Sequence, residues 1–229
     1  MPTRPHKPIA IFDIDGTIFR SSLLIELTKH LVKSNIFPYS AYKELEAEKL
    51  NWLNRKGSYE EYISKVVHVF EKRIRGVSVN KLTQATNQVL EKHKDRVYVY
   101  TRDLITRLKK THTLIAISGS PDMAVQEFKR IWGFSFAYGT QYEHKNGVYN
   151  GRINLVASKN KRELLQNFCA EHRVTLARSV GVGDTESDVS FLEMVFRPIA
   201  FNPNAKLLRV AKKKHWSIIV ERKDVIYTI

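Results

Sequence analysis

The chain has 229 residues, of which 43% are hydrophobic, and its only cysteine is Cys169. This length suits one large domain, or one core that carries an inserted subdomain. A single cysteine excludes an internal disulfide and a multi-cysteine metal site. The N-terminus lacks the apolar run of a signal peptide, and no segment is long enough to span a membrane. We therefore expect a soluble, reduced, cytoplasmic protein.

The net charge of +15 at pH 7 favours anionic partners, namely phosphorylated metabolites, nucleic acid or anionic lipid surfaces. The positive residues are spread along the chain, and the densest run is Lys212-Lys213-Lys214-His215. We expect this run to end a helix, where cations interact favourably with the helix dipole. It is interpreted as a solvated face, so nucleic acid is not an expected partner.

The segment from Ile9 to Phe12 is apolar, has high β propensity and runs directly into Asp13-Ile14-Asp15-Gly16-Thr17. An apolar run bounded by a turn signal predicts a buried strand, with the two aspartates at its carboxyl end. Ligands of open α/β sheets bind outside the carboxyl ends of the strands. The aspartates are therefore in a position suited to catalysis, although Asp-x-Asp alone is also compatible with a solvated turn after an edge strand.

Apolar residues recur at helical spacing over a long segment after this turn, and nothing there resembles a buried strand. Helices are expected over residues 23–32, 42–53, 59–74 and 82–90, and Pro38 ends the first of these patterns. We predict a helical cap domain at 19–95, inserted directly after the first strand. The remaining residues, 1–18 and 96–229, then form the core domain.

Strands and helices alternate from residue 96 onwards. Strands are expected over 114–117, near 134–138, and over 179–183, 198–201 and 217–220, the last being the final strand. Helices are expected over 102–110, 122–132 and 161–171, from about 187, and over 204–214. Asn146-Gly147 indicates a two-residue hairpin. This alternation predicts an α/β fold with a Rossmann-like, doubly wound parallel sheet.

Three of the predicted strands end in polar residues, which are Asp13 with Asp15, Ser118, and Asp184 followed by Asp188. The carboxyl ends of parallel strands converge on one edge of the sheet, where two unit charges about 4 Å apart repel by about 4 kcal/mol at an effective dielectric near 20. A hard divalent cation removes this penalty, and Mg²⁺ suits carboxylate, carbonyl and water ligands. Because Mg²⁺ commonly bridges protein and phosphate, the cluster also indicates a phosphoryl substrate.

The motifs occur in the order Asp-x-Asp-Gly-Thr, strand-end serine, lysine and Gly-Asp-x-x-x-Asp. This order resembles the haloacid dehalogenase superfamily of phosphohydrolases, and within it the phosphoserine-phosphatase-like branch, subfamily IB. That branch also has a helical cap between its first two motifs and a hairpin like the one at Asn146-Gly147. The resemblance covers residues 9 to about 201. It implies a Mg²⁺-dependent phosphatase that hydrolyses a small phosphorylated metabolite through an aspartyl-phosphate intermediate.

The resemblance assigns roles to the residues of the first two motifs. Asp13 resembles the nucleophile that attacks phosphorus, and Asp15 resembles the general acid and base, whose presence favours a phosphatase over a dehalogenase. Thr17 resembles the residue that orients this turn through its hydroxyl. Ser118 and the backbone of Gly119 are expected to hold phosphoryl oxygens.

The later motifs are expected to supply the metal site and a lysine. Asp184 resembles the residue that binds Mg²⁺ together with Asp13 and the main-chain carbonyl of Asp15, and Asp188 resembles an outer ligand or a group behind the ligands. Lys161 is preferred to Lys159 as the catalytic lysine, because it opens the predicted helix before the Gly-Asp strand. Its charge would contact the phosphoryl group and stabilise the anionic transition state.

Other interpretations of these residues stay open. Ser118 or Ser120 could cap the following helix, with capping the preferred reading for Ser120 taken alone. Asp188 could merely favour the N-terminus of its own helix. Two other functions are compatible with the chain: phosphotransfer to an acceptor other than water, and a basic protein that binds nucleic acid or anionic lipid on the same fold. The sequence does not specify the substrate or the oligomeric state.

Substrate choice can be narrowed at one position. In phosphoserine phosphatases, a glutamate shortly after the first motif faces the substrate's amino group. The spacing from Asp13 places that position here at or near Ser22, which carries no charge. The next acid, Glu26, lies a helical turn further on and is expected on the outer face of the cap. We therefore predict that phosphoserine is not the preferred substrate.

Overall fold

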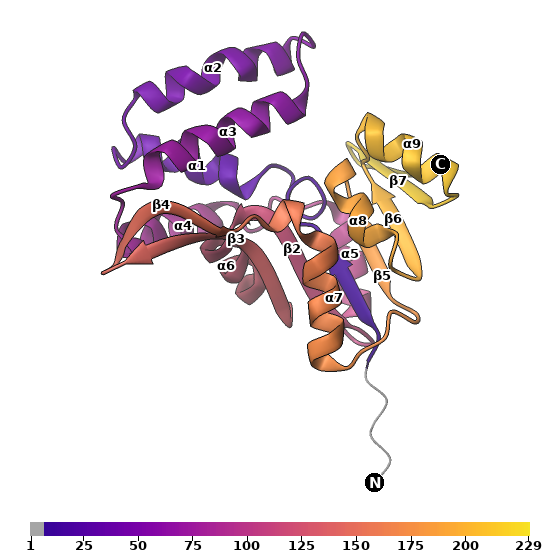
Figure 1. The fold of residues 1–229 in the computed structure, drawn as a ribbon. Coiled ribbons are helices and arrows are strands. Elements are labelled where there is room, and N and C mark those ends of the chain that lie inside the picture. The colour runs from indigo at the N-terminus through magenta and orange to yellow at the C-terminus, as the bar shows by residue number, and fades with distance from the viewer. Residues whose placement is uncertain (1–6) are drawn as a thin grey trace.

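The computed structural model describes residues 7–229 and contains one mixed sheet with the order β4-β3-β2-β1-β5-β6-β7-β8 (Figure 1). The central strand β1 (Ile9–Phe12) pairs in parallel with β2 (Thr113–Pro121) and β5 (Val180–Gly183). The other strands are β3 (Phe136–Lys145), β4 (Val148–Leu155), β6 (Arg197–Phe201), β7 (Ser217–Arg222) and β8 (Val225–Thr228). Only the β3–β4 and β7–β8 pairs of this sheet are antiparallel, so the predicted α/β fold with a largely parallel sheet is confirmed.

Helices occupy the long segment between β1 and β2 and also alternate with the later strands. The first group is α1 (Leu23–Lys33), α2 (Ser40–Leu53), α3 (Tyr59–Ile74) and α4 (Val79–His93). The later helices are α5 (Val99–Leu108), α6 (Asp122–Trp132), α7 (Lys161–His172), α8 (Val189–Leu192) and α9 (Ala205–Lys213). Within residues 7–229, no helix is both long and apolar enough to cross a membrane.

The sheet is covered on both faces because successive residues of a strand point to opposite sides. Phe12 packs on one face, in the cluster that includes residues of α5 and α6, and its ring meets Phe134 edge to face. Ile11 packs on the other face, in the cluster that includes residues of α7, α8 and α9. Burial of each such side chain contributes about 1.5–3 kcal/mol, so β1 is the best anchored strand and fixes the turn that follows it.

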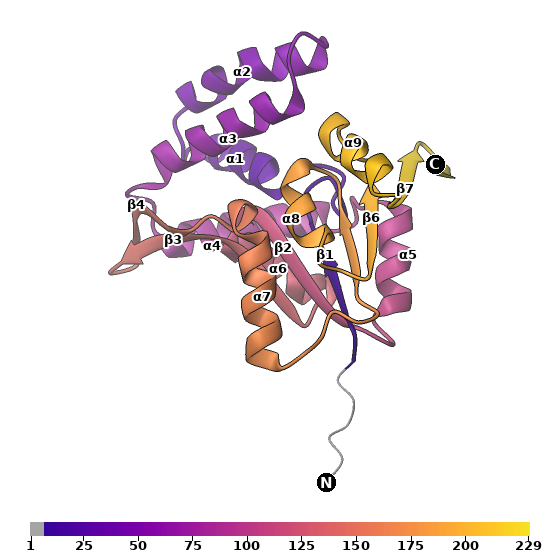
Figure 2. The same cartoon turned by 45° about the vertical axis from the view of Figure 1, so that its right-hand side comes forward.

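The first group of helices builds a hydrophobic cluster of its own. Val66 and Phe70 of α3 are fully buried in it, and a capping box between Ser58 and Glu61 fixes the start of that helix. The same cluster includes Tyr142 of β3, whose ring meets Phe70. Figures 1 and 2 show α2 and α3 above the carboxyl edge of the sheet. The position agrees with a cap, while the domain boundaries at 19–95 stay a prediction.

Several elements differ from the prediction in their bounds, and one strand was not predicted. Helix α5 begins at Val99, because the carboxylate of Glu221 accepts hydrogen bonds from the N–H groups of Val99 and Tyr100 across the fold. Strand β3 continues to Lys145 and forms the hairpin itself. Helix α8 has only four residues after a 3₁₀ turn at Glu186–Asp188, and β8 adds one more strand after β7.

Candidate active site

The structure brings the predicted site residues together at the carboxyl edge of the sheet. Asp13 and Asp15 follow β1, Ser118 and Gly119 lie in the last part of β2, and Asp184 follows β5 directly. Asp188 ends the 3₁₀ turn behind Asp184, and Lys161 is the first residue of α7. Their convergence follows from the parallel pairing of β1 with both β2 and β5.

Lys161 is the electrostatic centre of this cluster. Its Nζ donates hydrogen bonds to Asp13 Oδ1 at 2.6 Å and to Asp188 Oδ1 at 2.5 Å, and the side chain is only 1% exposed. Burial of an unpaired ammonium group costs several kcal/mol, so the lysine depends on both carboxylates. Burial lowers the pKa of Lys161, but the charges of Asp13 and Asp188 raise it by more, and the amine stays protonated.

Both carboxylate oxygens of Asp188 accept hydrogen bonds from the protein. Oδ1 accepts from Lys161, and Oδ2 accepts the backbone N–H groups of Asp184 and Thr185, both at 3.0 Å. A Cβ atom on Gly183 would lie 2.5 Å from the Cβ of Asp188, so glycine is needed at this strand end. These contacts support the interpretation that Asp188 lies behind the metal ligands. It holds Lys161 through one oxygen and the turn at Asp184 through the other.

One carboxylate oxygen of Asp13 has no hydrogen-bond partner in the described part of the chain. Asp13 Oδ2 is buried and has no hydrogen-bond partner within the described residues, although its Oδ1 is bound to Lys161. One carboxylate oxygen each from Asp13, Asp184 and Asp188 lie within 4.8 Å of one another. An orphaned buried carboxylate oxygen beside two further carboxylates fits a hard divalent cation, because such a cation supplies the missing partner. Asp13 and Asp184 could therefore hold a metal, with Asp188 behind them.

The pKa shifts of Asp13 and Asp184 agree with a metal ion at this position. Burial raises the pKa of Asp13 to about 8, although the charge of Lys161 counteracts the shift. Burial, followed by the charges of Asp13 and Asp188, also raises the pKa of Asp184 well above its usual range. Ionising Asp13 and Asp184 next to each other is costly, so a divalent cation would stabilise their charged forms.

Asp184 is oriented by the turn after β1. Thr17 donates its hydroxyl to Asp184 Oδ1 at 3.1 Å, which agrees with the orienting role expected of this threonine. Gly16 has a φ angle of +81°, and a Cβ there would lie 2.1 Å from Asp184 Oδ2. The glycine is thus required both by its left-handed backbone and by the space that Asp184 occupies.

Asp15 points to the other side of the turn, toward the end of β2. Its Oδ2 accepts hydrogen bonds from Ser118 Oγ at 2.5 Å and Ser120 Oγ at 2.8 Å, and its Oδ1 accepts the N–H of Leu23 at the start of α1. Ser120 Oγ also accepts the N–H of Leu24. Asp15 therefore links the first strand, the second strand and the first cap helix.

The capping interpretation of Ser118 and Ser120 is wrong. Strand β2 continues to Pro121, which stands at the N-cap of α6 and provides no side-chain hydrogen bond. Both serines instead meet Asp15, because residues two apart in an extended strand point to the same side. Ser120 was missed as a site residue, and the Ser-Gly-Ser alternation was the signal that could have revealed it.

Ser22 agrees with the prediction from the sequence, whereas the position of Glu26 does not. Ser22 is the N-cap of α1, is 2% exposed, and its hydroxyl accepts the N–H of Ile25, so it adds no charge near the site. Glu26 was expected on the outer face, but its side chain is only 10% exposed. Arg96 and Lys29 both form ion pairs with it, because the segment after α4 folds back against α1.

The start of α3 is a part of the cap that reaches toward the site. Burial, and then the charges of Asp15 and Asp184, raise the pKa of the Tyr59 phenol at the start of α3 above its usual value. The adjacent Glu60 forms an ion pair with Lys206 of α9, with 2.8 Å between Nζ and Oε2. Lys206 Nζ also pairs with Glu186 Oε1 at 2.6 Å. Sequence reasoning missed these residues, since no motif links α3 to α9.

The fold and this carboxylate-lysine constellation define a Rossmann-like hydrolase. The family model described as haloacid dehalogenase-like hydrolase matches residues 10–193, and the chain belongs to this family. A phosphoserine phosphatase, SerB1, of Mycobacterium tuberculosis (strain H37Rv) is 24% identical and covers 91% of this chain and 69% of its own length. A histidinol-phosphatase of Neisseria meningitidis serogroup C is 23% identical, and the match covers 93% of this chain and 98% of that protein.

Solved structures agree on the fold. A protein of unknown function from Bordetella pertussis Tohama I superimposes with a TM-score of 0.75 at 19% identity, over 93% of this chain and 98% of that one. A phospho-aspartyl intermediate analogue of phosphoserine phosphatase superimposes with a TM-score of 0.63 at 20% identity, over 96% of both chains. The expected resemblance to the phosphoserine-phosphatase-like branch is therefore confirmed at the level of relatives and fold.

We predict that Lys161→Ala loses most of the activity and that Lys159→Ala keeps most of it. Lys161 is buried between two carboxylates, whereas Lys159 ends a 3₁₀ turn and forms no ion pair within residues 7–229. The measurement is kcat with a generic phosphomonoester for the two matched variants, with circular dichroism as the control for folding. Equal losses of activity, or a larger loss for Lys159→Ala, would show that Lys161 is not the catalytic lysine.

Proposed function

We propose that this hydrolase is a Mg²⁺-dependent phosphatase that cleaves a small phosphomonoester through an aspartyl phosphate on Asp13. The observation that carries the proposal is the state of Asp13, with one oxygen on Lys161 and the other buried without a partner beside Asp184. The relatives named phosphoserine phosphatase and histidinol-phosphatase support a phosphoric monoester hydrolase. Asp13, Asp184 and, from the family resemblance, the main-chain carbonyl of Asp15 would hold the Mg²⁺.

The residues of the site suit the two chemical steps of such a reaction. Asp13 attacks phosphorus, the bond from phosphorus to the leaving oxygen breaks, and Asp15 gives that oxygen a proton. Water then attacks the aspartyl phosphate while Asp15 takes a proton from it, which releases inorganic phosphate and restores Asp13. When bound, Mg²⁺ supplies positive charge that offsets the carboxylates and the phosphoryl group.

Other residues are proposed to position the phosphoryl group. The protonated Lys161 lies against Asp13, so a phosphoryl group on Asp13 would meet its charge. Ser118 and the Gly119 backbone are proposed to contact phosphoryl oxygens. In the structure, the Ser118 hydroxyl is engaged with Asp15, so this role requires the hydroxyl to turn when substrate arrives.

The helical segment 19–95 is proposed to act as a cap that closes over small substrates. Two of its contacts with the core lie near the candidate active site. Asp15 and Ser120 accept the N–H groups of Leu23 and Leu24, and Lys206 bridges Glu60 of α3 to Glu186 beside the metal-binding turn. Closure would exclude water during the first step, which protects the leaving-group transfer from competing hydrolysis.

We predict that hydrolysis of a generic phosphomonoester stops after exhaustive chelation and returns when Mg²⁺ is restored. Asp13→Asn should abolish turnover, because a neutral amide is a poor nucleophile and a poor Mg²⁺ ligand. The measurement is phosphate release by the wild-type chain and the variant, with and without chelator. Activity that survives chelation would contradict the metal requirement, and a wild-type rate in Asp13→Asn would remove Asp13 from the mechanism.

Phosphoserine is predicted not to be the best substrate. Ser22 carries no charge, and its hydroxyl already accepts the N–H of Ile25. A substrate ammonium without a carboxylate partner loses a charge-assisted hydrogen bond of about 1.5–3 kcal/mol, which is roughly ten- to a hundred-fold in selectivity. The test compares kcat/KM for phosphoserine with that for glycerol, sugar and nucleotide phosphates.

A matched variant sharpens this comparison. Ser22→Asp keeps a side-chain acceptor for the start of α1 and adds a negative charge, so it should shift the kcat/KM ratio toward phosphoserine and away from glycerol phosphate. If the wild-type chain prefers phosphoserine by tenfold or more, the account of Ser22 is wrong, and another cap residue must supply the charge.

A further inference from the structure

Basic residues gather at the amino edge of the sheet, opposite the candidate active site. Parallel strands all begin at this edge, and the segments leading into them carry Lys7 before β1, Arg178 before β5, Arg197 at the start of β6, and Lys212–His215 before β7. Backbone contacts join these segments, since the N–H groups of Phe196 and Arg197 both donate to Ser179. The strand order β1-β5-β6-β7 thus places charges that are scattered in sequence along one edge of the sheet.

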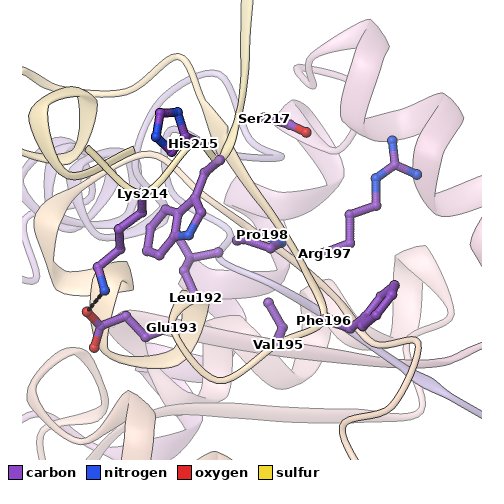
Figure 3. Close-up of a pocket in the computed structure, with 10 residues that line it drawn as sticks. Leu192, Glu193, Val195, Phe196, Arg197, Pro198, Lys214, His215 and Ser217 are labelled. Carbon is purple, nitrogen blue, oxygen red and sulfur yellow. Dashed lines mark ion pairs between the residues drawn. The ribbon is translucent and has the colours of Figure 1, made fainter. Parts of the chain in front are cut away.

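This basic edge contains two hollows. One, of about 260 Å³, is lined by Lys7, Arg173 and Arg178 together with small and apolar residues. The other, of about 420 Å³, is lined by Arg197, Lys214 and His215 together with Phe196 and Trp216 (Figure 3). Each hollow is therefore bordered by three basic side chains.

Most of this charge is not neutralised within the protein. In the part of the chain that the structure describes, Lys7, Arg173, Arg178 and Arg197 form no ion pair. The acid that borders the second hollow, Glu193, is bound by Lys214 and Arg162. Helix C-termini attract cations, which accounts for Lys212 and Lys213 at the end of α9. Lys7, Arg178 and Arg197 lie outside helices.

The backbone also carries a cost at this edge. Arg173, Arg178 and His215 have φ angles of 52°, 60° and 54°. Residues with a Cβ adopt this left-handed region at a cost of about 1–2 kcal/mol, and glycine avoids it. Stability alone would therefore favour glycine at these three positions, whereas the chain has basic side chains there. Arg55 and Lys223, away from this edge, adopt the same region, so the strain makes glycine the least disruptive replacement here and does not itself indicate a ligand.

The shape and chemistry of the surface favour a flexible chain of phosphates. One hollow is lined by segments that lead into β1 and β5, and the other by segments that lead into β6 and β7, so the strand order places both along the same edge. A single strand of nucleic acid can follow such hollows with its phosphates, while its bases stack on exposed aromatic rings. Phe196 is 74% exposed at this edge. A lipid bilayer is flat and cannot enter hollows.

We propose that this basic edge binds single-stranded nucleic acid without sequence preference. The site is separate from the catalytic residues, and its occupation does not depend on the proposed phosphatase function. The phosphates contact Lys7, Arg173, Arg178 and Arg197, and a base stacks on Phe196. Because the active site faces the opposite edge, the protein can hold a strand and admit a small substrate at the same time.

The test measures binding of a fluorescent oligothymidylate by anisotropy over a range of salt concentrations. Four phosphate contacts give a slope of log K against log salt of about −3, so affinity falls roughly 50-fold from 50 to 200 mM salt. The double variant Arg178→Gly with Arg197→Gln should bind more weakly and halve this slope. Glycine is chosen at position 178 because it tolerates the left-handed backbone.

A matched control removes two exposed lysines of α4, with Lys81→Gln and Lys92→Gln, and should leave both affinity and slope unchanged. Phe196→Ala should weaken binding about tenfold without changing the slope, because stacking does not release counterions. Phosphatase activity should be the same in all these chains. No binding of the oligonucleotide, equal losses in the two double variants, or binding only to vesicles of phosphatidylcholine with about 30% phosphatidylglycerol would each overturn the proposal.

Discussion

The buried ion pairs of Lys161 with Asp13 and Asp188 are the interaction on which the rest of the site depends. An ammonium group that is 1% exposed stays charged only while both carboxylates contact it. Asp188 in turn accepts the backbone N–H groups that shape the turn carrying Asp184, and Thr17 holds Asp184 from the first strand. The three segments are separate in sequence, so the site forms only when β1, β5 and α7 are packed together.

The parallel sheet also explains why the molecule has two electrostatic ends. The parallel strands end at the carboxyl edge, where acidic residues cluster around Lys161, and begin at the amino edge, where Lys7, Arg178 and Arg197 form no ion pair in the described chain. A metal and a phosphoryl group suit the first edge, and a polyanion suits the second. A protein with a net charge of +15 can therefore keep a carboxylate-lined site, because the opposite charges lie at opposite ends of the strands.

Sequence reasoning could predict what depends on local pattern and strand ends. Asp13 and Asp184 are predicted to lie together because each follows a parallel strand, whereas Lys161 is assigned to the site through the family resemblance; α6 is predicted with its observed bounds. Long-range contacts could not be predicted. Glu221 extends α5 by capping it from β7, Ser120 turns toward Asp15 instead of capping α6, and the scattered basic residues meet only once the strands are aligned. Each of these depends on partners far away in the chain.

The central claim is that Asp13 carries the phosphoryl group, and trapping the intermediate tests it most directly. The chain would be mixed with a radiolabelled phosphomonoester and Mg²⁺, quenched in acid during turnover, and digested so that the labelled peptide can be identified. The account predicts that the label is on the peptide containing Asp13, that borohydride reduction removes it, and that Asp13→Asn abolishes it. A label on another residue, or turnover by a chain that never becomes labelled, would contradict the account.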